Sequence, residues 1–293
     1  MTSPRRPGHV TGEGSVVGDV VAGFRITRRL RVNGCTAIYQ AVPADRATND
    51  RPSADSAAVV LKTLCRGGSR RIHRRLDNET AMLRHLIAVD VVPRLTATGE
   101  TEAQRFLAIE WRPGLTLRQL ARSSEPAIHD FASVAVAVAS AVARLHSAGV
   151  VHGDLSRRNV LVDGDRVTLI DFEGGCLIND DFRPLRKTTW AYAAPELAQP
   201  MRPDPLTDQY SIAAVLYRQL TGRRHRPVVD GVASDSPEAL SISPTRLTGG
   251  PAKEWPGLVE VFDTALAVVP GDRFDSMDRF VSALSASLTS PRR

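Results

Sequence analysis

The stretch His152-Gly153-Asp154-Leu155-Ser156-Arg157-Arg158-Asn159 decides how the rest of the chain is interpreted. A helical apolar run precedes it. Two apolar runs typical of strands follow it, and the second, Val167–Ile170, ends at Asp171. Such a strand–loop–strand unit presents Asp154, Asn159 and Asp171 from loops that buried strands hold in place. Two carboxylates and an amide are ligands for a hard cation, and in nucleotide enzymes such a cation usually sits on phosphates.

The full string is more specific than its parts. His-x-Asp alone also occurs by chance in solvated β-hairpins with polar turns, whereas this string adds an Asn at a fixed spacing and an Asp after the next strand. It resembles the catalytic loop of the protein kinases, His-Arg-Asp-x-x-x-x-Asn, followed by Asp-Phe-Gly. The resemblance implies that Asp154 accepts or orients the proton of a substrate hydroxyl and that Asn159 and Asp171 hold Mg²⁺. It also implies an α+β, two-lobed protein kinase-like fold, with a small antiparallel β-sheet lobe carrying one helix and a larger, mainly helical lobe.

The composition is that of a globular protein with a sizeable core. The chain has 293 residues, of which 42% are hydrophobic and 24% charged. Its formal net charge of +6 suits anionic partners such as nucleotides or nucleic acid. The sequence has no aromatic RNA-binding motif, zinc-finger spacing or basic heptad helix, so nucleic acid is not favoured as a partner.

The cysteines and the apolar runs bear on the compartment. Cys35, Cys65 and Cys176 include no Cys-x-x-Cys pair, so we expect neither a zinc site nor a disulfide framework, but thiols in a reducing cytoplasm. Residues 1–18 lack the apolar core of a signal peptide, and no apolar run reaches the length of a membrane span. The sequence therefore predicts a cytoplasmic protein without a membrane span.

A lysine lies inside the apolar, strand-like run Ala58–Leu64. Lys62 is one of only three lysines in this arginine-rich chain. A buried lysine is costly unless it is paired, and a lysine that reaches to water from an edge strand is the alternative. The run Arg74–Leu86 has helical spacing and contains Glu79. Kinases pair a strand lysine with a helix glutamate, so the resemblance implies that Glu79 aims Lys62 at the α- and β-phosphates of ATP.

Two further stretches correspond to nucleotide-contacting parts of kinases. Where kinases have a glycine-rich loop over the phosphates, this chain keeps only Gly34, and a tight turn at Asn33-Gly34 is expected. The run Arg105–Trp111 predicts a strand that leads into a Pro-Gly turn. By resemblance this is the hinge, where the backbone of Glu110 and Arg112 binds the adenine edge. A plain β-hairpin and a plain strand are the alternatives for the two stretches.

Beyond the Asp-Phe-Glu motif, the chain carries motifs whose role in the family is structural. The segment Thr188–Glu196 resembles the end of an activation segment, in which Thr189 lies beside the catalytic Asp. By position, Asp208 is the buried helix Asp that hydrogen-bonds the catalytic-loop backbone, and Arg273 pairs with Glu196. Buried ion pairs of this kind indicate register more than stability.

Three positions depart from the kinase pattern: the family's Arg, Lys and Gly are replaced by Gly153, Ser156 and Glu173. The Arg usually receives an activation-loop phosphate, so without it we expect activity that does not depend on phosphorylation of Thr188 or Thr189. The neighbouring Arg157 and Arg158 are hypothesised to replace the missing Lys. The extra carboxylate should restrict its loop and add a metal or water contact.

The remaining sequence predicts the other elements of the two lobes. Helices are expected from periodicity and end signals at Leu115–Arg122, Ile128–Ala148, Trp255–Val268 and Ser276–Leu288. A further strand is expected at Val91–Leu95. The polar segments Pro43–Ala58 and Arg223–Pro251 are expected to be loops, the second of them mobile.

These expectations combine into one domain. We expect a disordered tail at residues 1–19, a protein kinase-like domain at residues 20–288 with lobes at 20–112 and 113–288, and a short tail at 289–293. The implied function is that of a serine/threonine protein kinase, which uses ATP and Mg²⁺ to phosphorylate a protein or peptide hydroxyl.

Two alternatives remain open. A pseudokinase, a binding or scaffold module without turnover, is favoured by the degenerate glycine loop and by Ser156. His-Gly-Asp and Asp-Phe-Glu are also similar to motifs of lanthipeptide synthetase kinase domains, and His-Gly-Asp to that of the aminoglycoside phosphotransferases. The latter group lacks the Ala-Pro-Glu segment, so a small-molecule phosphotransferase is the weaker alternative.

Overall fold

In the computed structural model the chain divides into two units, each held together by its own contacts. Unit 1 comprises Met1–His73 and Arg94–Trp111, and unit 2 comprises Arg74–Pro93 and Arg112–Arg293. The structure describes residues 15–44, 58–123, 131–180, 188–199, 201–229, 231–233 and 235–289. Most of the two expected tails and of the loop expected at Pro43–Ala58 therefore lies outside the described residues. Of the first tail, residues 15–19 are described, and the Asp19 carbonyl accepts a hydrogen bond from the Ile26 N–H at 2.9 Å.

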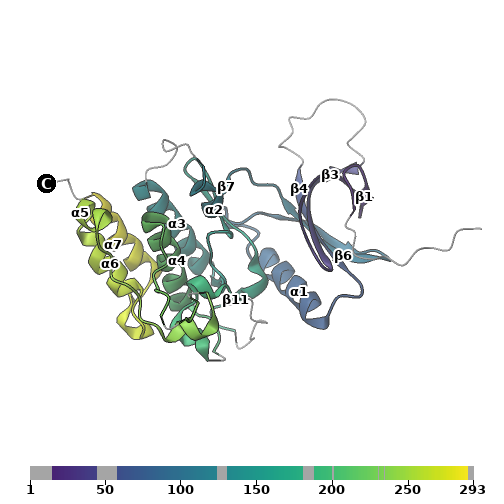
Figure 1. Ribbon diagram of the computed structural model, residues 1–293. Coiled ribbons are helices and arrows are strands. Elements are labelled where there is room, and N and C mark those ends of the chain that lie inside the picture. Colours follow the sequence, from purple (N-terminus) through teal and green to yellow (C-terminus); the bar gives the residue numbers. More distant parts are fainter. Residues whose placement is uncertain are drawn as a thin grey trace, which may run out of the picture. The chain divides into compact units, whose positions relative to one another are not determined.

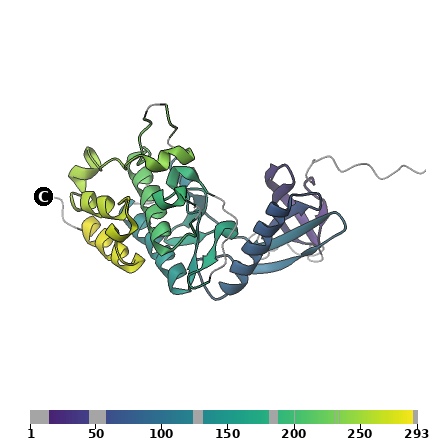
Figure 2. The same ribbon diagram turned by 90° about the horizontal axis from the view of Figure 1, so that it is seen from below.

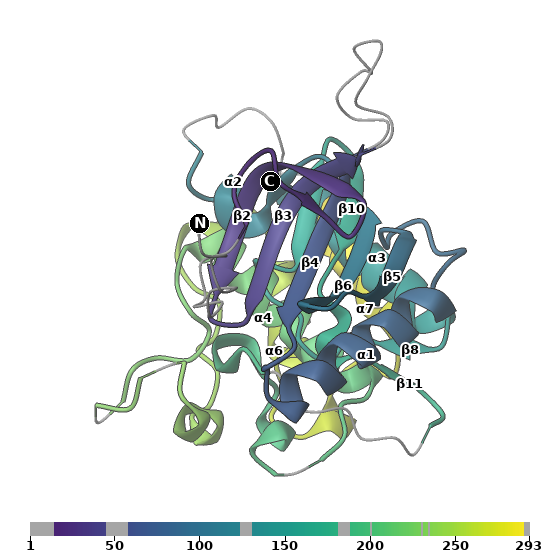
Figure 3. The same cartoon turned by 90° about the vertical axis from the view of Figure 1, so that its right-hand side faces the viewer.

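Unit 1 is a six-stranded antiparallel sheet (Figure 3). The strand order is β1-β2-β3-β4-β6-β5, with β1 at Val20–Val21, β2 at Phe24–Asn33, β3 at Thr36–Pro43, β4 at Val59–Cys65, β5 at Leu95–Glu100 and β6 at Gln104–Glu110. Alternate side chains of β3 and β4 are buried, because successive residues of a strand point to opposite faces. The buried face carries Ile26, Tyr39, Leu61 and Ala108, each at most 1% exposed.

The hairpin between β2 and β3 confirms the expected tight turn. Asn33 pairs with Thr36, and Gly34 between them has a φ of 56°. The strand expected at Val91–Leu95 is wrong in its bounds, since β5 begins only at Leu95. Val91 is apolar for another reason: it is buried in unit 2, where its carbonyl accepts a hydrogen bond from Leu169 at 2.8 Å.

A disulfide joins Cys35, in the β2–β3 turn, to Cys65, at the end of β4. The expectation that all three cysteines are free thiols is therefore wrong for these two, while Cys176 is a free, buried thiol. The pairing follows from the register of the sheet. Thr36 lies opposite Leu64, so the next position outward brings the two cysteines together, and the Cys65 N–H donates to the Cys35 carbonyl at 2.9 Å.

Reduction of this disulfide is expected to lower the free energy of unfolding by roughly 2–4 kcal/mol. The two cysteines are 30 residues apart, and a cross-link over such a loop restricts mainly the unfolded chain. Urea unfolding with and without dithiothreitol measures the effect, and a Cys35→Ser/Cys65→Ser variant should no longer respond to the reductant. Three titratable thiols in the denatured, non-reduced protein would contradict the bond.

Unit 2 is built mainly from helices. These are α1 at Arg70–His85, which begins in unit 1, α2 at Leu117–Leu120, α3 at Phe131–Ser147, α4 at Pro205–Thr221, α5 at Gly250–Glu254, α6 at Gly257–Ala265 and α7 at Met277–Thr289. Short strands complete it: β7 at Leu115–Thr116, β8 at Val150–Val151, β9 at Val160–Asp163, β10 at Arg166–Leu169 and β11 at Cys176–Leu177. Helices α3, α4, α6 and α7 pack on one another, as Figures 1 and 2 show. The expected α+β fold class is thereby confirmed.

The long helices have the ends that their sequences dictate. The described part of the helix expected at Ile128–Ala148 is α3, whose Ala and Val side chains form its buried face, and it is followed by Gly149 with a φ of 77°. Helix α4 begins with a capping box, in which the Asp204 side chain accepts a hydrogen bond from the Thr207 N–H at 2.8 Å. It ends at Gly222 in the left-handed conformation. Among the described residues, no helix has both the length and the apolar character needed to cross a membrane.

The expectation of a mobile loop at Arg223–Pro251 needs correction. Within its described part, His225, Arg226, Leu240 and Leu247 are each at most 3% exposed. The segment is polar in composition but is anchored at these buried positions.

Candidate active site

The backbone at the start of the loop His152–Asn159 is held by one buried carboxylate. Asp208, on α4 and without exposed surface, accepts hydrogen bonds from the His152 N–H at 2.7 Å and from the Gly153 N–H at 2.9 Å. The His146 ring lies 3.0 Å from the same carboxylate. The contact expected of Asp208 is confirmed. It fixes the loop immediately before Asp154.

Gly153 occupies a position that no side chain can share. Its φ is 73°, and a Cβ atom at this position would overlap the carbonyl of Gly174. The close approach of these two backbone segments therefore explains why this chain lacks the family's Arg. A guanidinium that would receive a phosphate cannot be supplied from this position.

Asp154 and Asn159 are brought together in the loop between β8 and β9. Asp154 is 5% exposed, and its Oδ1 accepts a hydrogen bond from the Thr189 N–H at 2.8 Å. The Asn159 side-chain amide donates to the Asp154 carbonyl at 2.9 Å. The Ile170 N–H donates to the Asn159 carbonyl at 3.0 Å, which brings the end of β10 against the same loop. The expected proximity of Thr189 to Asp154 is confirmed.

Asp171 has a strained backbone. It is one of two non-glycine residues with positive φ among those described, with φ 70° and ψ 68°. Residues held in this region cost free energy and cluster at functional sites. The surrounding structure enforces the conformation: Phe172 is fully buried, its ring centroid lies 4.8 Å from that of His152, and the His152 Nε2 lies 3.0 Å from the Ile170 carbonyl.

Three carboxylates lie close together here, and one of them belongs to Asp171 itself. Oxygen atoms of Glu79, Asp171 and Glu173 all lie within 4.8 Å of one another. Helix α1, which carries Glu79, is fixed to the loop by Asn78, whose amide donates to the carbonyls of Glu173 at 3.1 Å and Gly175 at 2.8 Å. The Glu173 carboxylate thus lies beside that of Asp171, while the metal or water contact expected of it stays a prediction. Carboxylate oxygens suit Mg²⁺, and Asn159 offers an amide oxygen from the adjoining loop.

The expected phosphate-contacting residues of the sheet belong to unit 1. Lys62 lies on β4, half-buried, opposite Ile38 on β3 and Leu107 on β6. Gly34 lies at the tip of the β2–β3 hairpin. Glu79 belongs to unit 2 and is 4% exposed. The pairing of Lys62 with Glu79 stays a prediction.

The segment expected to form the hinge lies at the boundary of the two units. The Glu110 N–H donates to the Arg94 carbonyl at 2.9 Å, and its carboxylate lies 3.4 Å from the Arg94 Nε. The Trp111 N–H donates to the Ala58 carbonyl at 3.1 Å. Arg112 is the first residue after this boundary. The adenine contacts expected of Glu110 and Arg112 stay predictions.

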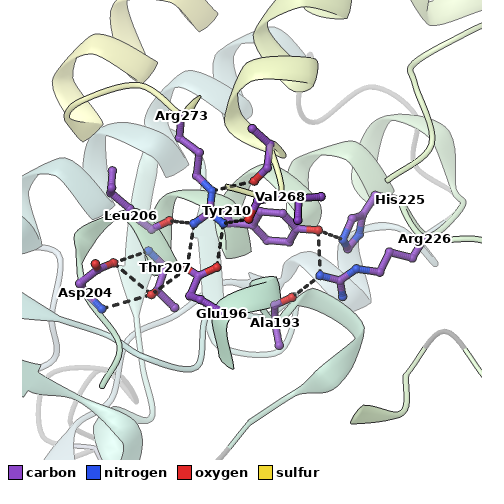
Figure 4. Close-up of polar contacts among 11 residues, drawn as sticks. Ala193, Glu196, Asp204, Leu206, Thr207, Tyr210, His225, Arg226, Val268 and Arg273 are labelled. Carbon is purple, nitrogen blue, oxygen red and sulfur yellow. Dashed lines mark hydrogen bonds and ion pairs between the residues drawn. The ribbon is translucent and has the colours of Figure 1, made fainter. Parts of the chain in front are cut away.

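A buried polar network supports the segment that ends at Glu196 (Figure 4). Arg273 has no exposed side-chain surface, and its two terminal nitrogens each lie 2.8 Å from an oxygen of Glu196. The Thr207 hydroxyl donates to the same carboxylate at 3.2 Å, and the Leu206 carbonyl accepts a bond from Arg273 at 2.9 Å. The expected pairing of Arg273 with Glu196 is confirmed.

The same network contains three residues that the sequence analysis missed. Arg226 donates to the Ala193 carbonyl at 2.6 Å and to the Tyr210 hydroxyl at 2.8 Å (Figure 4). The His225 Nε2 lies 3.0 Å from that hydroxyl. Burial raises the pKa of Tyr210 to about 12, against the opposing effect of Arg226. Burial, and then the charge of Arg226, hold the pKa of His225 well below its usual range.

Stability is expected to fall in acid because of His225. Below about pH 6.5 the His225 ring of the unfolded chain binds a proton, whereas the buried ring of the folded protein does not. The contribution of His225 to the free energy of unfolding is therefore full above that pH and is lost as the pH falls. The slope contributed by one such proton is about 1.4 kcal/mol per pH unit. Urea unfolding between pH 7.5 and 5 measures it. His225→Gln keeps a hydrogen-bond acceptor but does not titrate, so its profile should be flatter; parallel profiles would contradict the assignment.

Comparison with known proteins decides the family. Residues 49–242 match the family model described as "Protein kinase domain". The chain belongs to the protein kinase family. We therefore interpret the loop of Asp154, the strained Asp171 and the Glu196–Arg273 pair by comparison with other protein kinases.

Several relatives are serine/threonine-protein kinases. PknJ of Mycobacterium tuberculosis is 29% identical over 289 residues, covering 92% of this chain and 46% of PknJ. PknF of the same species is 28% identical over 292 residues, covering 92% of this chain and 57% of PknF. The chain thus spans about half the length of these curated relatives. They lend no support to the similarity with lanthipeptide synthetase kinase domains.

A solved structure shares the fold. The Cydia pomonella granulovirus kinase PK-1 superimposes with a TM-score of 0.68 at 13% identity, over 91% of this chain and 95% of that one. The expected protein kinase-like fold is confirmed by this likeness together with the family match.

Proposed function

We propose that this chain is an ATP- and Mg²⁺-dependent serine/threonine protein kinase that phosphorylates a protein or peptide hydroxyl. The observation that carries the proposal is the fixed carboxylate of Asp154. Its Oδ1 is bound by the Thr189 N–H, and the loop before it is anchored by Asp208. A general base has to be held within hydrogen-bond reach of the proton that it accepts, and the fixed position of the Asp154 carboxylate supports this role for it.

In this proposal Asp154 acts on the hydroxyl group of the acceptor. The hydroxyl oxygen of the acceptor forms a new bond to the γ-phosphorus, the bond from that phosphorus to the bridging oxygen breaks, and ADP leaves. The hydroxyl proton passes to the Asp154 carboxylate. Because the phosphoryl transition state is loose, most of the catalysis consists of positioning and electrostatic stabilisation.

The nucleotide contacts are assigned by the resemblance to kinases. Asn159 and Asp171 would hold Mg²⁺, which when bound neutralises charge on the phosphates. Lys62, oriented by Glu79, would contact the α- and β-phosphates, and the turn at Gly34 would cover them. The backbone of Glu110 and Arg112 would bind adenine.

The second candidate function is that of a pseudokinase. The turn with a single glycine at Gly34 and the Ser at position 156 favour it, since both remove groups that usually contact phosphates. The retained Lys62, Asp154 and Asp171 favour an enzyme. A small-molecule phosphotransferase is disfavoured by the Ala-Pro-Glu segment, whose Glu196 is docked on Arg273.

A transfer assay separates these functions. Purified protein with γ-labelled ATP is offered serine- and threonine-containing peptides and small hydroxyl compounds, with Mg²⁺ or with a chelator, while ATP binding is measured separately. Mg²⁺-dependent label on a peptide supports the proposal. ATP binding without transfer to any acceptor supports the scaffold, and label on a small molecule alone supports the third function.

A cytoplasmic location belongs to the same proposal. It would expose the Cys35–Cys65 disulfide to reduction. Trapping free thiols in cells before lysis tests it. If Cys35 and Cys65 escape the trapping reagent because they are disulfide-bonded, the result would argue for an oxidising compartment.

A further inference from the structure

A basic cavity opens beside the catalytic loop in unit 2. Its volume is about 530 Å³, and its wall is drawn from α2, the catalytic loop, the segment around Thr189 and the C-terminal part of α4 and beyond. Six arginines line it: Arg118, Arg122, Arg157, Arg158, Arg218 and Arg224. We call it the arginine cavity. Its lining includes one carboxylate, Asp235, which already pairs with Arg224 at 2.9 Å.

The arginine cavity extends to residues that adjoin Asp154. Thr189 and Ser156 belong to its lining. The Thr189 N–H is the group that binds the Asp154 carboxylate at 2.8 Å. An acceptor whose hydroxyl reaches Asp154 therefore places its neighbouring residues along this wall.

Most arginines of the cavity are not paired with a carboxylate among the described residues. Among the described residues, no carboxylate forms an ion pair with Arg118, Arg122, Arg157 or Arg158. Arg158 and Arg122, in that order, lower the pKa of Arg118. Burial lowers the pKa of Arg157. Cations gathered in this way repel one another, and a bound anion would relieve the repulsion.

Contacts within unit 2 fix the wall of the cavity and the guanidinium groups of Arg218 and Arg224. The Arg118 N–H donates to the Arg157 carbonyl at 2.9 Å, which ties α2 to the catalytic loop. Arg218 donates to the Tyr192 hydroxyl at 3.2 Å and lies over its ring at 5.9 Å. Arginines presented by a fixed wall bind carboxylates and phosphates through paired N–H groups at a low cost in side-chain entropy.

We infer that the arginine cavity binds acidic side chains that flank the hydroxyl of a peptide acceptor. The substrate class is a serine- or threonine-containing peptide with aspartate, glutamate or phosphorylated residues next to the phosphorylated position. This inference rests on the proposed kinase function. It differs from the hypothesis that Arg157 and Arg158 replace the missing lysine at the γ-phosphate, because it predicts an effect on the peptide and not on ATP.

The experiment compares four peptides with one acceptor serine in acidic, phosphoserine-containing, neutral and basic surroundings. Arg118→Gln/Arg122→Gln removes two charges from the cavity and none from the catalytic loop. The matched control is Arg166→Gln/Arg279→Gln, which removes two exposed arginines outside the cavity lining. The readouts are kcat and KM for each peptide, KM for ATP, and ATP-free binding of fluorescent peptides.

The wild type is expected to favour an acidic peptide over the neutral one by about 10- to 100-fold in kcat/KM, the range of one or two charge-assisted contacts. The cavity variant should lose most of this preference through KM, while the control keeps it. A preference for phosphoserine alone supports the inference, with phosphate as the anion. Equal use of neutral and acidic peptides, or a variant effect on KM for ATP only, overturns it. If no peptide is phosphorylated, the proposed function fails, whereas stronger binding of the acidic peptide that the cavity variant loses still supports the cavity.

Discussion

Replacement of Asp154 by Asn is expected to lower the turnover of peptide phosphorylation by about 10²- to 10⁴-fold, the usual contribution of a general base. The substitution removes the carboxylate that accepts the hydroxyl proton but keeps the shape of the side chain. The Asn side-chain oxygen can still accept the hydrogen bond from the Thr189 N–H, which measures 2.8 Å in the wild type. The loop should therefore keep its position, and the affinity for ATP should stay within about threefold because no phosphate contact is assigned to Asp154.

Steady-state kinetics, together with ATP binding by calorimetry, checks this result. Asp163→Asn is the matched control, since Asp163 is exposed at the end of β9 and has no assigned role. The control should keep the wild-type turnover. Equal turnover of Asp154→Asn and wild type would remove Asp154 from the mechanism, and absence of turnover in both would favour the pseudokinase.

Local motifs predicted that several of the candidate residues lie close together, because their spacing is fixed by short elements. One hairpin, β9–β10, separates Asn159 from Asp171, so both could be assigned to one site without knowledge of the rest of the fold. Asp208 was found through the family pattern, and its two hydrogen bonds to the loop follow from that position. Gly153 was recognised only as a departure from the kinase pattern. The reason for it, the approach of the Gly174 carbonyl, depends on contact between distant segments.

Features that depend on register or on tertiary contact escaped the sequence analysis. The Cys35–Cys65 bond requires the pairing of β3 with β4, which residue spacing does not reveal. The polar composition of Arg223–Pro251 hid His225 and Arg226, because a buried polar residue is recognised only by its partners. The arginine cavity draws its wall from residues 118 to 235, so no single motif could indicate it.

Replacement of Arg273 by Ala is expected to lower the free energy of unfolding by about 3–5 kcal/mol, the cost of leaving one member of a buried ion pair alone. The Glu196 side chain is only 10% exposed and would lose both of its 2.8 Å contacts with the guanidinium. The carbonyls of Leu206 and Ala267, which accept from Arg273 at 2.9 and 3.0 Å, would also lose their donor. Arg273→Lys should recover only part of the loss, because an ammonium cannot reproduce the planar fork.

Urea unfolding of the single variants and of Glu196→Ala/Arg273→Ala separates the pair from its surroundings. The double variant should be more stable than the sum of the two single losses predicts, since no charge is left buried alone. Arg246→Ala is the matched control: it breaks the pair with Asp263 at 3.0 Å, whose side chains are 68% and 40% exposed. That loss should stay below about 1 kcal/mol. Equal losses for Arg273→Ala and Arg246→Ala would show that Glu196 reaches water without its partner, and the segment that carries Thr189 to Asp154 would then not depend on this pair.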